Sequence, residues 1–492
     1  MLVNVLGALV AIIDRKNKGN VIPAAIQMMK SLSERGNDSF GLATHDKVFL
    51  CESLRELSES RIHSSAAIGY GLNRIFSKDI PQPLADGTTR LAFEGRIYPT
   101  SEVPDCEKAL SLTEERTDNG LGEFVHRVEG AYAAAIMHNG QLAVARDLLG
   151  CKPLYWGEAR GIMAFASEQK ALWTIGINMP RRFPPGEVWV LGAGDISVRK
   201  PDDLTCHAHR SDIDSAAEEL SDLVVESIRR RSGDLKRVAI AYSGGVDSAV
   251  VASSSALAGL DVELFTVTMR GNGEVEHAKR SAEALGFPLT VKQYSLSDLR
   301  SSIPEVIKRI ERADVMSLAI AVPIFWVAQL AEKEGFQAFF AGQGADELFG
   351  GYDRYVTAYQ REGPEKANEM MMKDVQRIAE LNLERDEQAT AGSKAELRLP
   401  FSDLDLVRFA LSLPIHLKIG GTDEALQKLI LRRVAQLQGV PKSASERPKR
   451  AMQYATGVAS SIREIAKQAR ITPRDYVSKQ YDRFTRRLLV RS

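Results

Sequence analysis

The sequence predicts two domains of different fold class: an α+β N-terminal domain built on packed antiparallel sheets, and an α/β C-terminal domain with a doubly wound parallel sheet. Residues 1–200 carry short β-type runs separated by turn residues, with few helical patterns among them. From Ile213 onward, helical patterns alternate with buried apolar runs. The polar, unpatterned residues 200–210 between them are typical of a linker. We therefore expect domains at 1–200 and 213–470, followed by a basic tail at 471–492.

The N-terminal domain is predicted from short runs of apolar and β-branched residues. The expected strands are Ala8–Ile13, Leu91–Phe93, Tyr132–Met137, Leu142–Ala145 and Val188–Leu191. Helical periodicity is found at Ile22–Ser33 and Gly122–Val128. The apolar stretch 1–13 follows no basic segment and is too short to span a membrane, so we interpret it as a buried strand.

The C-terminal domain is predicted from longer elements in strict alternation. Expected helices are Ser215–Arg230, Glu274–Leu285 and Val322–Glu334, and expected strands are Val238–Ala241, Glu263–Thr268, Pro288–Lys292 and Ala338–Gly342. From Asp353 onward the patterns are mainly helical. The basic tail, with adjacent Arg486 and Arg487, is interpreted as a solvated helix face in preference to a nucleic-acid patch.

Composition is that of an ordinary globular protein. The 492 residues are 44% hydrophobic and 26% charged, and 64 basic residues balance 64 acidic ones. This balance gives no indication of a nucleic-acid or membrane partner. The four cysteines are scattered, without the spacing of a disulfide framework or a zinc site. A cytoplasmic protein is expected.

One short stretch predicts a phosphate site. The apolar run Arg237–Ala241 ends in Tyr242, followed by Ser243-Gly244-Gly245-Val246-Asp247-Ser248 at the start of a helix. Adjacent glycines leave backbone N–H groups uncovered, and the helix N-terminus adds its positive dipole end. The Gly-Lys-Ser/Thr ending of the other common phosphate loop is missing. A polyphosphate is therefore the expected ligand, with Asp247 placed to hold Mg²⁺.

A second glycine-rich stretch follows the strand expected at Ala338–Gly342. It reads Gly342-Gln343-Gly344-Ala345-Asp346-Glu347-Leu-Phe-Gly350-Gly351-Tyr352. A helix cap followed by a glycine turn would explain it without a ligand, but its glycines on both sides of an Asp-Glu pair favour close backbone approach to a ligand. Ligands of open α/β sheets collect where such strands end. Asp346 is therefore expected to join Asp247 in holding Mg²⁺.

Together these motifs resemble those of the asparagine synthetase family, and the resemblance covers nearly the whole chain. Further matches are Asp386-Glu387, the segment Glu396-Leu-Arg398-Leu-Pro-Phe-Ser-Asp403, and Arg447-Pro-Lys449, which resembles the element carrying the family's catalytic lysine. In the first half, the stretches 35–41, 145–155, 165–172 and 183–186 are similar to those of glutamine amidotransferases with an N-terminal nucleophile. The resemblance implies an N-terminal domain of that type and a C-terminal ATP pyrophosphatase domain.

The first half lacks what glutamine hydrolysis needs. The family's nucleophile is an N-terminal cysteine whose own amine acts as base. Here position 2 is Leu2, alignment on Gly7 puts Leu6 at the cysteine's place, and no cysteine precedes Cys51. Where the family has an oxyanion-stabilising asparagine, this chain has Glu94, whose charge would repel the oxyanion; losing one such donor costs roughly 10²–10³-fold in rate. Although Arg74 matches the glutamine-binding arginine, we predict no glutaminase activity.

The resemblance implies a nearly complete ATP-binding set in the second half. Ser243, Gly244, Gly245 and Ser248 would hold the pyrophosphate, and Asp247 and Asp346 the Mg²⁺. The residues that match the family's adenosine contacts are Tyr242, Val267, Ala341 and Gly342. On its own Lys449 would be a solvated lysine in a basic run; the resemblance implies that it stabilises charge on the α-phosphate and pyrophosphate.

Two departures affect the predicted catalytic residues, which are Lys449, Gln343 and Glu347. The family has a carboxylate where this chain has Gln343, and an amide cannot accept a proton as a general base. Gln388 replaces a family arginine. These changes imply a slower reaction or a different nucleophile.

The expected activity is that of an ATP-dependent carboxylate–amine ligase releasing AMP and pyrophosphate, with ATP and Mg²⁺ as cofactors. Aspartate and free ammonia are the simplest substrates. The alternatives are a relative acting on another acid with an amine of the substrate, as in β-lactam synthetases and peptide cyclases, and a catalytically weak scaffold or regulatory subunit. The expected partners are small molecules, with no membrane or nucleic acid and a possible homodimer. The sequence leaves the acid, the nitrogen donor and the oligomeric state open.

Overall fold

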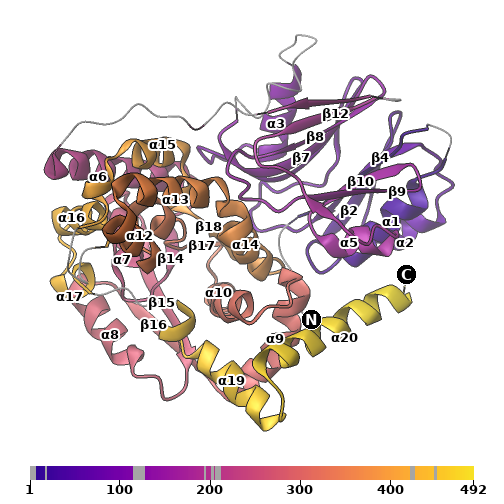
Figure 1. Cartoon of the computed structure of the whole chain (residues 1–492). Helices are drawn as coiled ribbons and strands as arrows, with labels where there is room; N and C mark the ends of the chain where they lie inside the picture. The colour runs from indigo at the N-terminus through magenta and orange to yellow at the C-terminus, as the bar shows by residue number, and fades with distance from the viewer. Residues whose placement is uncertain are drawn as a thin grey trace. The chain divides into compact units, whose positions relative to one another are not determined.

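The computed structural model describes residues 7–16, 19–114, 128–192, 195–200, 204, 212–420, 427–447 and 452–491. It divides into two compact units (Figure 1). Unit 1 comprises Met1–Asp202 with Ala391–Lys394 and Asp482–Ser492, and unit 2 comprises Asp203–Thr390 with Ala395–Tyr481. The linker expected at 200–210 and the helix expected at Gly122–Val128 fall almost entirely outside the described residues.

Unit 1 confirms the predicted α+β class, because its described strands form two antiparallel sheets. The seven-stranded sheet has the order β11-β9-β10-β1-β4-β2-β3 and the six-stranded sheet the order β13-β12-β8-β7-β6-β5. The strands of the first sheet are β1 (Ala8–Asp14), β2 (Ser39–Ala43), β3 (Val48–Cys51), β4 (Ala66–Leu72), β9 (Tyr155–Ala159), β10 (Ile162–Ala166) and β11 (Arg181–Arg182). Those of the second are β5 (Leu84–Asp86), β6 (Thr89–Ile97), β7 (Gly130–His138), β8 (Gln141–Arg146), β12 (Val188–Leu191) and β13 (Ile196–Arg199).

Strand β1 shows how unit 1 is layered, because both of its faces are buried. Leu9 and Ala11 belong to the apolar core shared with β7 and β8 of the second sheet. Val10 and Ile12 belong to a second core, which packs against α1 (Ile22–Ser31) and α5 (Gln169–Thr174). The helices α2 (Leu54–Glu59) and α3 (Asp105–Glu114) complete this unit, α3 lying against β6. A strand buried on both faces is continuously apolar, which explains the sequence of β1.

Unit 2 confirms the predicted parallel sheet, whose described strands have the order β16-β15-β14-β17-β18. Its strands are β14 (Arg237–Ala241), β15 (Asp261–Met269), β16 (Leu289–Tyr294), β17 (Ala338–Phe340) and β18 (Glu396–Arg398). The chain runs outward from β14 through β15 to β16, and later pairs β17 with the other edge of β14, with Ile240 opposite Phe340. The strand order therefore reverses between β14 and β17, where open α/β sheets bind ligands.

Two groups of helices surround this sheet. In one, α6 (Ile213–Arg230), α7 (Val246–Leu257) and α16 (Leu429–Leu437) pack together. In the other, α10 (Val315–Lys333) packs against α9 (Leu296–Ile310), α14 (Glu384–Thr390) and α19 (Val458–Gln468). The remaining helices are α8 (Glu274–Leu285), α11 (Ala345–Phe349), α12 (Asp353–Glu362), α13 (Pro364–Gln376), α15 (Leu404–Ser412), α17 (Lys442–Ser445), α18 (Met452–Ala455) and α20 (Pro473–Arg491), with short turns η1 (Ala379–Leu383), η2 (Pro400–Ser402) and η3 (Ile415–Leu417).

Helix α10 is unusual because it is apolar nearly all round. Among the described helices it alone is long and apolar enough to cross a membrane, and 67% of its apolar window is buried inside the protein. It begins seven residues before the helix predicted from the sequence, because Asp314 caps it by accepting a hydrogen bond from the Ser317 N–H at 2.7 Å. Burial on several sides explains its composition.

Candidate functional site

The predicted phosphate loop connects β14 to α7. Gly245 precedes the first residue of α7, and Gly244 has a φ of +73°, a conformation that favours glycine. Ser248 closes the turn, since its hydroxyl accepts a hydrogen bond from the Ser243 N–H at 3.3 Å and donates one to the Gly245 carbonyl at 3.1 Å. The Ser248 side chain therefore stabilises this turn at the N-terminus of α7, and the strand–turn–helix arrangement is the one expected from the sequence.

The second glycine-rich stretch approaches this loop closely. A Cβ atom on Gly342 would lie 2.8 Å from the Cβ of Asp247, closer than side chains pack. Gly344, with a φ of +93°, begins α11 and so sets the position of Asp346 and Glu347 in its first turn. The two loops therefore meet at the switch point of the sheet, and Gly342 permits the contact.

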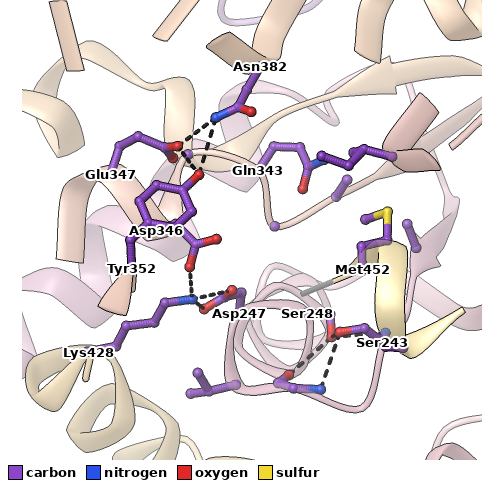
Figure 2. A pocket seen from close by; sticks show the side chains of 18 of the residues that line it. Ser243, Asp247, Ser248, Gln343, Asp346, Glu347, Tyr352, Asn382, Lys428 and Met452 are labelled. Atoms are coloured by element: carbon purple, nitrogen blue, oxygen red, sulfur yellow. Dashed lines mark hydrogen bonds and ion pairs between the residues drawn. The ribbon is translucent and has the colours of Figure 1, made fainter. Parts of the chain in front are cut away.

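Asp247 and Asp346 face each other across a single ammonium group (Figure 2). The Nζ atom of Lys428 lies 2.6 Å from Asp247 Oδ1 and 2.6 Å from Asp346 Oδ1. The Lys428 side chain is 3% exposed, whereas those of Asp247 and Asp346 are 27% and 25% exposed. Burial lowers the pKa of the Lys428 ammonium, but the two carboxylates outweigh burial and hold this pKa well above its usual value. The lysine is therefore charged at physiological pH.

The two carboxylates fit the chemistry of Mg²⁺. Proteins usually hold this hard cation through one or two carboxylates together with phosphate oxygens of a substrate. In the described parts of the chain, no group of three or more His, Cys, Asp and Glu side chains forms a metal-binding cluster. Asp247 and Asp346 are the residues that would hold the ion.

Gln343 is engaged with a buried carboxylate. Its Nε2 donates to Asp386 Oδ2 at 2.6 Å, and the Arg385 guanidinium forms two hydrogen bonds to the same carboxylate, at 2.8 and 3.1 Å. Asp386 is fully buried, and a carboxylate at position 343 would face it at hydrogen-bond distance. A neutral amide at 343 avoids that repulsion.

Glu347 is the centre of a second polar group. Tyr352 donates its hydroxyl hydrogen to the Glu347 carboxylate, and Asn382 Nδ2 donates to the same oxygen at 2.5 Å. Burial first, and then the charge of Glu347, raise the pKa of Tyr352 far above its usual value, so the phenol stays protonated. Figure 2 shows these three side chains at one side of the pocket. Glu347 is 1% exposed, and Tyr352 links it to the pocket.

The structure brings most of the predicted residues to one pocket in unit 2. The predicted residues that line it are Ser243, Gly245, Asp247, Ser248, Ala341, Gly342, Gln343, Asp346 and Glu347. Tyr242 and Val267 line an adjoining, more apolar hollow that shares Ala241 and Met452 with it. Lys449 lies outside the described residues, but its neighbour Arg447 donates to the Ser243 carbonyl at 3.4 Å and pairs with Glu274.

Several other residues that line this pocket were not predicted from the sequence. They are Lys428, Asn382, Arg385 and Arg432. Lys428 and Arg432 lie at the start of α16, whose sequence is that of an ordinary amphipathic helix with basic residues. Their sequence pattern gives no indication that they line a pocket, which is apparent only from their contacts in the structure.

Known protein families match both halves of the chain. The profile of the asparagine synthase family matches residues 219–365 and 357–488, and that of the glutamine amidotransferase domain matches residues 75–174. A putative glutamine-hydrolysing asparagine synthetase of Methanocaldococcus jannaschii is 31% identical over 521 residues, covering 92% of this chain and 94% of the relative.

The chain belongs to the asparagine synthase family. The glutamine-hydrolysing asparagine synthetase B of Escherichia coli K12 is 24% identical over 468 residues, covering 90% of this chain and 81% of that protein. A probable glutamine-hydrolysing asparagine synthetase of Acanthamoeba polyphaga mimivirus is 27% identical over 381 residues, covering 70% of this chain and 66% of that protein. This asparagine synthase homologue is accordingly an ATP-dependent carbon–nitrogen ligase. Its membership in the family is what supports ATP and Mg²⁺ as cofactors.

In this asparagine synthase homologue, buried ion pairs occupy the part of unit 1 that carries the amidotransferase motifs. Arg35 Nη2 lies 2.6 Å from Glu94 Oε1, and Arg35 Nη1 lies 3.2 Å from Glu168 Oε1. Glu168 also pairs with Lys170, and the Ser167 hydroxyl donates to Glu94. We call these five residues the buried ion cluster; their exposure is 3% or less.

The buried ion cluster refines the expectation for Glu94. The charge of Glu94 was expected to repel an oxyanion. In the structure Glu94 lies in β6 and its charge is neutralised by Arg35. Arg35 also donates from Nε to the Gly7 carbonyl at 2.9 Å, next to position 6, where the family has its cysteine. Leu2 and Leu6 lie outside the described residues. A carboxylate paired in this way offers no hydrogen-bond donor to an oxyanion.

Proposed function

We propose that this ligase adenylates the side-chain carboxylate of aspartate with Mg²⁺–ATP, releases pyrophosphate, and forms the amide with free ammonia in place of glutamine. The observation that supports it is a contrast in this chain: Asp247 and Asp346 open onto a pocket, while Glu94 and Arg35 are sealed together at the amidotransferase motifs. This contrast supports activation of a carboxylate in unit 2, and the absence of the family's cysteine and oxyanion-stabilising asparagine from the sequence supports a nitrogen source other than glutamine.

Each part of ATP is assigned to residues of unit 2, most of them on the two glycine-rich loops. Ser243, Gly244, Gly245 and Ser248 bind the pyrophosphate portion through hydroxyls and the backbone N–H groups at the start of α7. Asp247 and Asp346 would hold the Mg²⁺, which would supply charge neutralisation at the phosphates. Tyr242 and Val267, in the apolar hollow, and Ala341 and Gly342, in the adjoining pocket, would bind the adenosine. Lys449 stabilises charge on the α-phosphate as the pyrophosphate leaves.

Glu347 is proposed to accept the proton that Gln343 cannot. An attacking amine must lose a proton, and a neutral amide has no basic site for it. Tyr352 lines the pocket and donates to Glu347, so its oxygen can take a proton from nitrogen while its own hydrogen passes to the carboxylate. Gln343 keeps a positioning role through its hydrogen bond to Asp386.

A second candidate is a ligase for another acid whose own amine attacks the acyl-adenylate. It is favoured by Gln343 and Gln388, each of which is a neutral amide where the family has a charged residue. Under either candidate we propose small-molecule substrates only, a cytoplasmic location and a possible homodimer.

Pyrophosphate release from ATP and Mg²⁺ separates these proposals. We expect release that requires aspartate, amide formation with ammonium, and none driven by glutamine. Release with some other acid would favour the second candidate, and glutamine-driven amide formation would refute the sealed amidotransferase site. ATP binding without turnover of any acid would contradict both candidates and favour a catalytically weak scaffold or regulatory protein.

The role of Lys449 has its own test. Lys449→Ala is expected to lower pyrophosphate release by about 10²–10³-fold while ATP binding persists, because the charge acts mainly on the transition state. The matched control is Lys442→Ala, since the Lys442 side chain is 84% exposed and lies on the same basic run. Equal rates of pyrophosphate release for the two variants would show that Lys449 has no catalytic role.

A further inference from the structure

Lys428 has a backbone conformation that lysine rarely adopts. It precedes α16 with φ 60° and ψ 40°, in the left-handed region that disfavours residues with a Cβ atom. Such conformations persist only where the surroundings impose them, and they collect at functional sites.

The surroundings of Lys428 fix it on both sides. Gln427 forms an antiparallel bridge with Ile419, and the Leu429 N–H donates to the Lys418 carbonyl at 3.0 Å. Arg432 Nε donates to the Gln427 carbonyl at 2.7 Å. The strained residue is therefore held in a frame that directs its side chain into the pocket.

The end of the Lys428 side chain lies in a space shaped by glycine. A Cβ atom on Gly351 would lie 2.3 Å from Lys428 Cε and 2.0 Å from Asp346 Oδ1. The backbone of Gly351 therefore packs directly against the lysine and its carboxylate partner. Any other residue at 351 would displace one of them, so the ion group of Lys428, Asp247 and Asp346 is a closely fitted unit.

This unit conflicts with a metal ion at the same oxygens. The ammonium lies 2.6 Å from an oxygen of each carboxylate, which is the bridging position that a shared cation would take. Two carboxylates and one ammonium leave a formal charge of −1, so a divalent ion is attracted less strongly than by a bare carboxylate pair. Two cations in adjacent positions also repel each other.

We propose that Lys428 is a tethered counter-cation that occupies the space between Asp247 and Asp346 in the nucleotide-free protein and makes metal binding depend on nucleotide. The inference rests on the proposed binding of Mg²⁺–ATP. Phosphate oxygens of a nucleoside triphosphate give the ammonium a new partner and give the metal additional ligands, so metal and nucleotide bind cooperatively. Lys428 acts through the carboxylates and is a positioning residue.

The test is Mn²⁺ binding to the full chain, measured by electron paramagnetic resonance with and without a non-hydrolysable ATP analogue. The wild-type protein is expected to bind Mn²⁺ weakly alone and at least tenfold more tightly with the analogue. Lys428→Met keeps the length of the side chain and removes the charge, and is expected to raise nucleotide-free Mn²⁺ affinity about tenfold, so that the analogue has a smaller effect. The exposed-site control Lys442→Met is expected to bind Mn²⁺ like the wild type.

The outcomes distinguish this inference from the proposed function. Unchanged or weaker nucleotide-free Mn²⁺ binding by a folded Lys428→Met protein would overturn the inference. If that variant does not fold, Lys428→Gln is measured in its place. The wild-type protein also tests the inference without any variant. If it binds Mn²⁺ equally tightly with and without the analogue, the counter-cation role is overturned. A wild type that binds no Mn²⁺ even with the analogue would instead refute the proposed ATP and metal site.

Discussion

Each unit of this protein contains a compact group of opposite charges, and the two groups differ in their access to solvent. In unit 1 the side chains of Arg35 and Glu94 are each 1% exposed. In unit 2 the Lys428 side chain is 3% exposed, but its partners Asp247 and Asp346 are 27% and 25% exposed. The first group is closed on all sides, whereas the second has one buried member and two that face a pocket.

This difference shows how similar residues acquire different roles. In a buried group the charges pair with one another, and removing one member leaves an uncompensated charge in a medium of low dielectric constant. A group that faces a pocket can exchange a partner for a ligand, because water and ions reach it. We therefore assign a structural role to the buried ion cluster of unit 1 and a binding role to the carboxylates of unit 2.

The largest expected effect comes from opening the buried ion cluster. Arg35→Met removes the countercharge of Glu94 and leaves Glu168 with Lys170 alone, and should destabilise unit 1 by about 3–5 kcal/mol because a buried carboxylate is left uncompensated. Calorimetry of the full chain measures the shift. The control is Arg55→Met, a side chain that is 85% exposed. A loss no larger than that of the control would show that the cluster is not a structural centre.

A smaller effect is expected from Glu168, and it depends on pH. Burial raises its pKa, but Lys170 and Arg35 outweigh burial and hold the pKa below the ordinary 4.5. A carboxyl group with a depressed pKa contributes stability above its unfolded pKa, and this contribution is lost as pH falls through the lower, folded value. Glu168→Gln should therefore cost about 2 kcal/mol near pH 7.

The cost of Glu168→Gln should shrink below about pH 4, as the wild-type carboxylate takes up its proton. Chemical denaturation at a series of pH values gives the curve. A difference between variant and wild type that stays constant down to pH 3 would mean that Glu168 is not ionised in the cluster.

The smallest expected effect sharpens the comparison from the side of unit 2. Gln343→Glu places a carboxylate against the buried Asp386, which already accepts from Arg385. Like charges at hydrogen-bond distance raise the pKa of one of them, so the variant should lose about 1 kcal/mol at pH 8 and less at pH 5. Gln343→Met, which adds no charge, is the control for loss of the hydrogen bond. A pH-independent difference between the two variants would contradict the electrostatic account.

The fold and the two glycine-rich loops are predictable from the sequence for a physical reason. Each loop is contiguous, and its glycines and carboxylates are adjacent in sequence, so local pattern alone places Asp247 and Asp346 at the ends of strands. Even so, what brings them together is the pairing of β14 with β17, which only the general rule for parallel sheets predicts.

The roles of residues that depend on contacts distant in sequence could not be predicted. Lys428 meets Asp247 across 181 residues, and its left-handed conformation has no sequence signal such as glycine or asparagine. Glu94 was expected to repel an oxyanion, and its pairing with Arg35 was not predicted because Arg35 is 59 residues away in the sequence. Strand β18 (Glu396–Arg398) has two charged residues in three and does not have the sequence of a buried strand. Arg398 is nevertheless buried there, with two hydrogen bonds to Asp234.

The distance along the chain between Asp247 and Lys428 also has a consequence for the newly made protein. At about 5–20 residues per second, a ribosome needs on the order of 10–40 s to add the residues that separate them. In the last part of that interval, after Asp346 has been added, both carboxylates can be present without their lysine. Such a nascent chain would attract divalent ions more strongly than the finished enzyme, and completion of α16 would end that period.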